Sequence, residues 1–175
     1  SAPEVRTAVL VRDGDKNTVI SGFYGLTVMK STGSGFKGYP KDKYTTLEET
    51  DDRILATDIA TRWRYNSTDI DFDATYEKVK EVMLSTFTEG HSPSLQQTLY
   101  QMGQAVISAV PEIDEIKFSC PNKHHFVSDL FFAGVENPNE VFYAADRPYG
   151  LIEATIAREG APSEEEAWVG IAAFI

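Results

Sequence analysis

Hydrophobic and polar residues alternate near the start of the chain, which is typical of extended strands. One side of the first alternating segment carries Val5, Thr7, Val9 and Val11. The turn-forming residues DGDKN interrupt this pattern at 13–17, and a second extended run follows. Residues 4–30 are therefore predicted to form a β-hairpin.

A second alternating stretch covers residues 53–65 and predicts one long strand. The side chains that share one side of it are Leu55, Thr57, Ile59, Thr61, Trp63 and Tyr65. A Gly-rich segment, residues 31–40, connects the hairpin to this region. We expect that segment to be a loop, either flexible or lining a binding site.

The hydrophobic period then changes to about 3.6 residues, as in amphipathic helices. The first helix is predicted to begin with Asp71 or Asp73 as N-cap and to end at Gly90. Its apolar stripe consists of Tyr76, Val79, Met83 and Phe87. The second helix is predicted to begin with Ser92 as N-cap and Pro93 as its first residue. Its stripe consists of Leu95, Leu99, Met102, Val106 and Val110.

Strand patterns return after the two helices, at about 113–120, 124–132, 140–144 and 151–158. The order of strands, two helices and strands, with short connections, favours an α+β arrangement in which two helices pack on one face of an antiparallel sheet. We expect a single domain over residues 1–160. An acidic segment and an apolar tail occupy residues 161–175.

Composition narrows the classes of partner that the protein can bind. The 175 residues carry a net charge of −11, which repels nucleic acid and anionic lipid. Cys120 is the single cysteine, so no intrachain disulfide is expected, and a reduced cytoplasmic location follows. The longest apolar run, 167–175, is far shorter than the roughly 20 residues of a membrane span.

Two possible cofactor sites are excluded by the residues around them. The sequence GSGFKG at 33–38 matches the dinucleotide pattern, but Tyr39 and Pro40 follow it where a helix would have to begin. His124 and His125 are neighbours on a predicted strand and must face opposite ways. Cys120 lies about 13 Å from His124 along such a strand. We therefore expect no metal and no organic cofactor, and Cys120 is interpreted as a buried hydrophobe.

Three positions carry candidate chemistry. Arg53 stands at the head of an apolar strand, where it would meet a carboxylate or a planar polar ligand, and a structural ion pair is the ordinary role. Gln96 falls in the first turn of a helix, where such a residue is usually only solvated. The sequence PNKHHF at 121–126 places two histidines at a strand junction. From the residues alone, these positions indicate a small-ligand site of unidentified kind.

Several motifs together resemble the urate oxidase (uricase) family, and in particular the second half of a bacterial member. In chain order they read SGFKGY at 34–39, DKYTTL at 42–47, TDDRILAT at 50–57, SLQQTLY at 94–100, PNKH at 121–124 and NEVF at 139–142. The resemblance extends over about residues 4–158. It implies a T-fold, in which two such units make one subunit and sheets join across subunits into a tunnel-shaped barrel of a homotetramer.

The same resemblance implies substrate-binding roles for five residues. Phe36 would stack on the purine, Arg53 would pair with one edge of urate, and Gln96 would pair with the opposite edge. Leu95 would contribute a backbone N–H, and Leu47 would supply an apolar wall.

Two further residues would be catalytic. Asn122 would hold dioxygen or the attacking water above the ring, and His124 would join a proton relay. The family oxidises urate with dioxygen to 5-hydroxyisourate and hydrogen peroxide, without metal or organic cofactor.

The resemblance covers only half of a family subunit, so the partner implied is the N-terminal T-fold half, as a separate or cleaved chain. The tail 168–175 would then dock on another subunit. A non-catalytic T-fold module that binds purines or builds an assembly is the alternative. A T-fold pterin or GTP enzyme would require zinc ligands, which the sequence does not offer at usable spacing.

Overall fold

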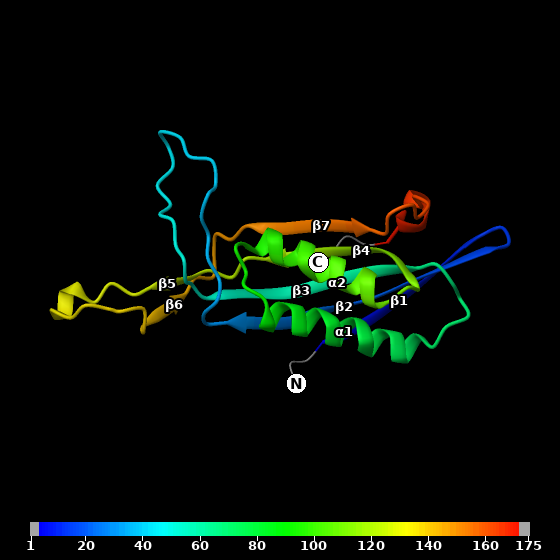
Figure 1. Ribbon diagram of the computed structural model, residues 1–175, viewed down its shortest axis with the longest axis horizontal. Helices are drawn as coiled ribbons and strands as arrows, with labels where there is room; N and C mark the ends of the chain where they lie inside the picture. The colour runs from blue at the N-terminus through cyan, green and yellow to red at the C-terminus, as the bar shows by residue number, and fades with distance from the viewer. Residues whose placement is uncertain (1–3, 172–175) are drawn as a thin grey trace.

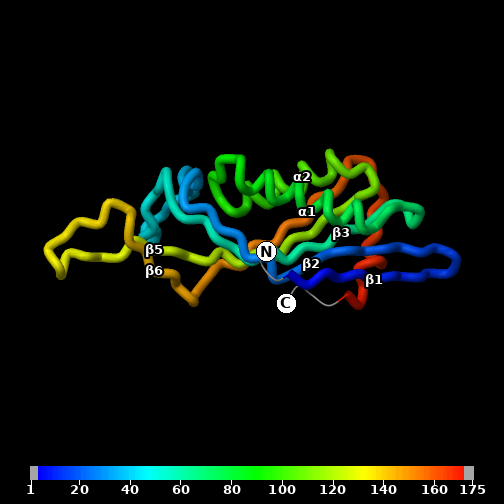
Figure 2. Tube along the Cα trace, turned by 90° about the horizontal axis from the view of Figure 1, so that it is seen from below, coloured from blue at the N-terminus to red at the C-terminus, as the bar shows by residue number. Residues whose placement is uncertain are grey.

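The computed structural model describes residues 4–171 and contains one five-stranded antiparallel sheet with two helices on one face (Figures 1 and 2). The strand order is β1-β2-β3-β4-β7. The strands are β1 (Val5–Asp13), β2 (Lys16–Lys30), β3 (Leu55–Tyr65), β4 (Ile113–Pro121) and β7 (Leu151–Ala157). This arrangement confirms the predicted α+β architecture, the hairpin and the long strand.

The core lies between the sheet and the helices and is centred on β3. Trp63 is fully buried and makes edge contacts with the rings of Phe23 and Tyr65 and a tilted contact with Tyr76. All six side chains predicted to share one side of this strand are at most 3% exposed. The alternation in the sequence therefore identified the face that the helices cover.

Helix α1 (Phe72–Glu89) begins and ends as predicted. The Asp71 carboxylate accepts hydrogen bonds from the N–H groups of Asp73 and Ala74, and Gly90 follows the last turn. The four residues of the predicted stripe are all buried. Such capping satisfies free N–H donors of the first turn, so the start of this helix is defined by the local sequence.

Helix α2 (Leu95–Ala109) begins two residues later than predicted. Its N-cap is Ser94, whose hydroxyl accepts a hydrogen bond from the N–H of Gln97. Ser92 is buried instead in a bridge with the loop that contains Ser34. The prediction of Ser92 as cap was wrong because the tertiary pairing of this residue takes precedence over its capping preference.

Gly103 lets α2 approach the edge strand β7 closely. A Cβ at this position would lie 2.7 Å from Cδ1 of Ile156. A larger side chain would require Ile156 or the helix to shift, so the glycine allows the close packing of the two elements.

A narrow ribbon connects β4 to β7 and projects from the body of the molecule (Figures 1 and 2). It contains β5 (His125–Val127), the 3-10 turn η1 (Phe131–Ala133) and β6 (Phe142–Ala144). The strand predicted over 124–132 is thus shorter than expected. Large apolar side chains are exposed along this arm, namely Phe126, Val127, Phe131, Phe132, Val135, Val141 and Tyr143.

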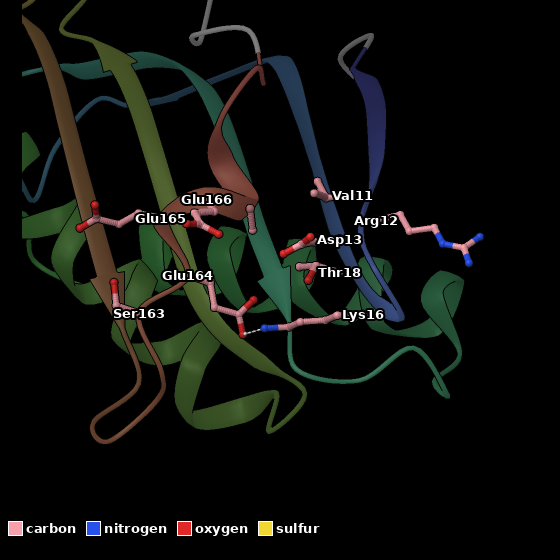
Figure 3. A pocket seen from close by; sticks show the side chains of 10 residues that line it. Val11, Arg12, Asp13, Lys16, Thr18, Ser163, Glu164, Glu165 and Glu166 are labelled. Carbon is pink, nitrogen blue, oxygen red and sulfur yellow. Dashed lines mark ion pairs between the residues drawn. The ribbon is translucent and has the colours of Figure 1, made fainter.

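The segment after β7 packs on the sheet face that the helices leave open. The buried Arg64 donates to the carbonyl of Pro162 and lies 3.4 Å from the Glu164 carboxylate, which also pairs with Lys16 (Figure 3). In the 3-10 turn η2 (Glu165–Trp168), the indole of Trp168 donates to Glu115. A cavity of about 640 Å³ lies between this segment and the hairpin.

Part of the predicted tail, residues 172–175, lies outside the described residues. Its docking on another subunit therefore stays a prediction. Within residues 4–171, neither helix is both long and apolar enough to cross a bilayer.

Candidate active site

The residues implicated by the sequence gather at one end of the sheet. There β2 and β4 end, β3 begins, and the turn between α1 and α2 approaches the loop of residues 31–54 (Figure 1). The cavity beside the acidic segment lies elsewhere, near the turn that connects β1 to β2. None of these residues lines it.

A backbone junction joins the Gly-rich loop to the start of α2 and to the start of β3. The N–H of Gly35 donates to the carbonyl of Ser92, and the N–H of Ser92 donates to Gly33, both at 2.9 Å. The N–H of Arg53 donates to the carbonyl of Ser34 at 2.8 Å. This Ser34–Ser92 junction brings Arg53 and the first turn of α2 to the same place.

The loop between the junction and β3 folds back on itself. Phe36 and Thr50 exchange two backbone hydrogen bonds of 2.8 and 3.1 Å. The ring of Phe36 stacks on Tyr39, with centroids 4.7 Å apart and an interplanar angle of 18°. The sequence did not identify Tyr39 as a site residue. The only hint was a second aromatic residue close to Phe36 in the same loop.

Arg53 presents a half-buried cation next to the Phe36 ring. Its guanidinium carbon lies 5.2 Å from the ring centroid, and its Nε is buried without a hydrogen-bond partner. No carboxylate within residues 4–171 pairs with it, so the structural ion pair that the residue type suggests does not form among these residues. Burial lowers the pKa of Arg53, although a guanidinium stays charged at any physiological pH. The arrangement can accept a planar anion.

The first turn of α2 offers backbone donors at the same junction. Leu95 is fully buried in the core, whereas the side chain of Gln96 is exposed. The N–H groups of the first helical residues have no intrahelical acceptor, and the Ser94 hydroxyl satisfies only that of Gln97. The exposed amide of Gln96 can therefore serve a ligand, and the N–H of Leu95 is a candidate donor that has no intrahelical acceptor but lies buried in this chain.

The segment that follows β4 is held by two backbone hydrogen bonds. The N–H of Asn122 donates to the carbonyl of Gly150 at 2.8 Å, and that of Lys123 donates to Ala56 at 2.9 Å. The ammonium of Lys123 pairs with Asp58 of β3 at 2.5 Å. This segment is thus fixed against the first residues of β3, which begins two residues after Arg53.

His124 lies near Arg53 and stacks on the first residues of the arm. Its ring centroid lies 5.7 Å from that of Phe126 at an interplanar angle of 24°. Burial and, to a lesser degree, the charge of Arg53 lower the pKa of His124. The imidazole is therefore neutral at neutral pH and can accept a proton.

Leu47 is set apart from the other candidates. Its side chain is 58% exposed in the loop, and its carbonyl accepts a hydrogen bond from the hydroxyl of Tyr39. An apolar wall at this position would require a neighbour that covers it.

The described residues contain no group of three His, Cys, Asp or Glu side chains placed to hold a metal ion. Cys120 is fully buried, and burial raises the pKa of its thiol to about 12. The thiol is therefore protonated and behaves as part of the core.

Comparison with known proteins identifies the family. The model of the family described as Uricase matches residues 19–153. A uricase from Arthrobacter globiformis is 62% identical over 98% of this chain and 57% of its own length. A uricase from Dictyostelium discoideum is 39% identical over 89% of this chain and 54% of its own length.

Solved structures give the same result. The crystal structure of the Arthrobacter globiformis uricase superposes with a TM-score of 0.93 and 61% identity, over 96% of this chain and 58% of that chain. Urate oxidase from Bacillus sp. TB-90 superposes with a TM-score of 0.72 and 26% identity, over 90% of this chain and 56% of that one. The chain spans just over half the length of these relatives, and it belongs to the uricase family.

Proposed function

We propose that the protein containing this chain oxidises urate with dioxygen to 5-hydroxyisourate and hydrogen peroxide, without a metal or organic cofactor. The observation that carries the proposal is the half-buried guanidinium of Arg53, which lies beside Phe36 and has no carboxylate partner among the described residues. Membership of the uricase family supports the same reaction.

The chemistry of urate suits these groups. Urate is a flat anion with hydrogen-bond donors and acceptors around its rim. The forked guanidinium of Arg53 can bind one edge, while the amide of Gln96 and the N–H of Leu95 bind the opposite edge. Phe36 can cover the face of the ring. Leu47 would form an apolar wall once a neighbouring chain covers it.

The reaction transfers two electrons from urate to dioxygen. Dioxygen takes up two protons and leaves as hydrogen peroxide, and water adds to the oxidised ring as its new hydroxyl group. Urate is electron-rich when doubly deprotonated, so the protein has to position reactants and move protons. In this scheme Asn122 holds dioxygen or water, and neutral His124 accepts and returns a proton.

We further propose that the complete site needs the N-terminal T-fold half of the enzyme, in a tetramer of full subunits whose sheets join into a barrel. This chain covers only 57% and 54% of the lengths of the two relatives. Strands β1 and β7 lie at the sheet edges, where further strands can pair. The T-fold unit at 1–160, on which the segment with Pro162 and Glu164 also packs, presents an exposed apolar arm suited to contacts between chains. We propose the same role for the apolar tail at 168–175 beyond Trp168, which contacts Glu115 of this chain. The free thiol of Cys120 is consistent with a cytoplasmic location.

The decisive experiment mixes urate in air with the assembled protein, in which this chain is combined with the N-terminal half. We expect the urate absorbance band to disappear and hydrogen peroxide to accumulate, at a rate that a metal chelator does not change. Urate binding without oxygen uptake would contradict the proposal and favour a non-catalytic purine-binding or assembly module.

Replacement of Arg53 by Lys should weaken urate binding by about 1.5 to 3 kcal/mol. An ammonium is a point charge and cannot form the paired hydrogen bonds of a guanidinium fork. The dissociation constant, measured by titration with urate under nitrogen, checks this. Arg12→Lys is the matched control because Arg12 lies near the turn of the hairpin, where its Nε donates to Gly14. Equal affinity of the Arg53→Lys variant and the parent would refute the role of Arg53.

A further inference from the structure

Lys30, the last residue of β2, connects the end of α1 to the turn that precedes α2. Its ammonium donates to the carbonyl oxygens of Phe87, at 3.2 Å, and Gly90, and to the hydroxyl of Ser92, at 3.1 Å. These three contacts use all three donors of the ammonium. The side chain therefore has one defined position rather than a range of solvated ones.

The electrostatic setting of Lys30 favours that position. Helix α1 has no basic residue in its last turn, and a cation at a helix C-terminus is stabilised by the carbonyl groups that end there. The ammonium lies 5.7 Å from the ring centroid of Phe87, and burial lowers its pKa. By contrast, Lys78 on the exposed side of α1 pairs with Glu81, three residues along the same helix.

The contact with Ser92 links Lys30 to the candidate site. Ser92 and Ser34 are 2% and 0% exposed, and they form the junction described above. Through it, the carbonyl of Ser34 holds the N–H of Arg53. Ser94, two residues after Ser92, caps α2 and sets the direction of its first turn. The ammonium thus fixes the junction from which both groups extend.

We propose that Lys30 is a positioning residue for substrate recognition, whose ammonium fixes the Ser34–Ser92 junction and so aligns the Arg53 guanidinium with the first turn of α2. This inference rests on the proposed function, in which these two groups bind opposite edges of urate. The segment of Asn122 and His124 is held by other bonds, to Gly150 and Ala56. Loss of the ammonium should therefore impair binding more than turnover.

Steady-state kinetics of the assembled enzyme separate the effect on substrate binding from the effect on turnover. Lys30→Met keeps the length of the side chain and removes its charge and donors. We expect KM for urate to rise about tenfold, with kcat within about twofold of the parent. Lys30→Arg should recover most of the loss because a guanidinium can also donate to these carbonyls, and Lys78→Met should change neither constant. A fall in kcat with KM unchanged would mean loss of folded enzyme and would overturn the positioning role.

Amide hydrogen exchange provides a measurement that does not depend on turnover. In Lys30→Met, exchange at the N–H groups of Ser92, Gly35 and Arg53 should become about tenfold faster, while that of Lys123 stays the same. If Lys30→Met does not fold, Ser92→Ala, which removes only one acceptor, should give the same pattern to a smaller degree. Unchanged exchange at Arg53 in the folded variants would contradict the inference. Absence of urate oxidation by the unsubstituted enzyme would contradict only the proposed function.

Discussion

Replacement of His124 by Ala should lower kcat for urate about 100-fold while changing the dissociation constant of urate by less than about threefold. The structure keeps this imidazole neutral through burial and the nearby charge of Arg53, so it can take a proton that the reaction releases. Stopped-flow turnover measurements and anaerobic urate titration of the assembled enzyme check the two quantities separately.

The pH profile offers a second test of the same role. Because the neutral form is the active one, kcat of the parent enzyme should fall on acidification through a pKa below 6.5, the ordinary value for histidine. The His124→Ala variant should lose this limb of the profile. His91→Ala is the matched control, because His91 is an exposed histidine outside the proton relay and its loss should leave the acidic limb of the profile in place. Weaker binding with normal kcat would instead make His124 a ligand contact.

Local sequence determined those parts of the fold whose partners are close in the chain or whose pattern is strongly periodic. The stripe from Tyr76 to Phe87 and the Asp71 cap define α1 because both act within a few turns of one helix. Two serines flank Pro93, and local preference could not distinguish them. The choice of Ser94 as cap follows from the burial of Ser92 against Ser34, a contact about 60 residues away in the chain.

The candidate site was predictable in its residue types but not in its contacts. The position of Arg53 at the head of a buried strand indicated a cation that needs a partner, and the sequence pattern favoured a carboxylate. The structure places the guanidinium over Phe36, which a folded loop brings back toward β3. Lys30 carried no signal in the sequence, because its three acceptors come from the end of α1 and the turn after it. Such roles arise only from tertiary structure.

Replacement of Trp63 by Ala should lower the free energy of unfolding by about 3 to 5 kcal/mol, the largest effect on stability that we expect. The indole is fully buried at the centre of the core, so its removal leaves a cavity between β3 and α1. The measurement is urea denaturation at fixed protein concentration. It should be followed by far-UV circular dichroism, because the substitution removes one of only two tryptophans.

Two further variants separate packing from the chemistry of the indole. The Nε1 of Trp63 is buried without a hydrogen-bond partner, so Trp63→Phe removes an unsatisfied donor and should cost only about 1.5 kcal/mol. Trp168→Ala, at the other tryptophan, removes contacts with Glu115 and Lys117 on the sheet face that the helices leave open. It should lower the free energy of unfolding by about 1 kcal/mol. Equal losses for Trp63→Ala and Trp168→Ala would contradict a core centred on Trp63. That result would mean that the segment after β7 stabilises the fold as much as the packing of the helices on the sheet does.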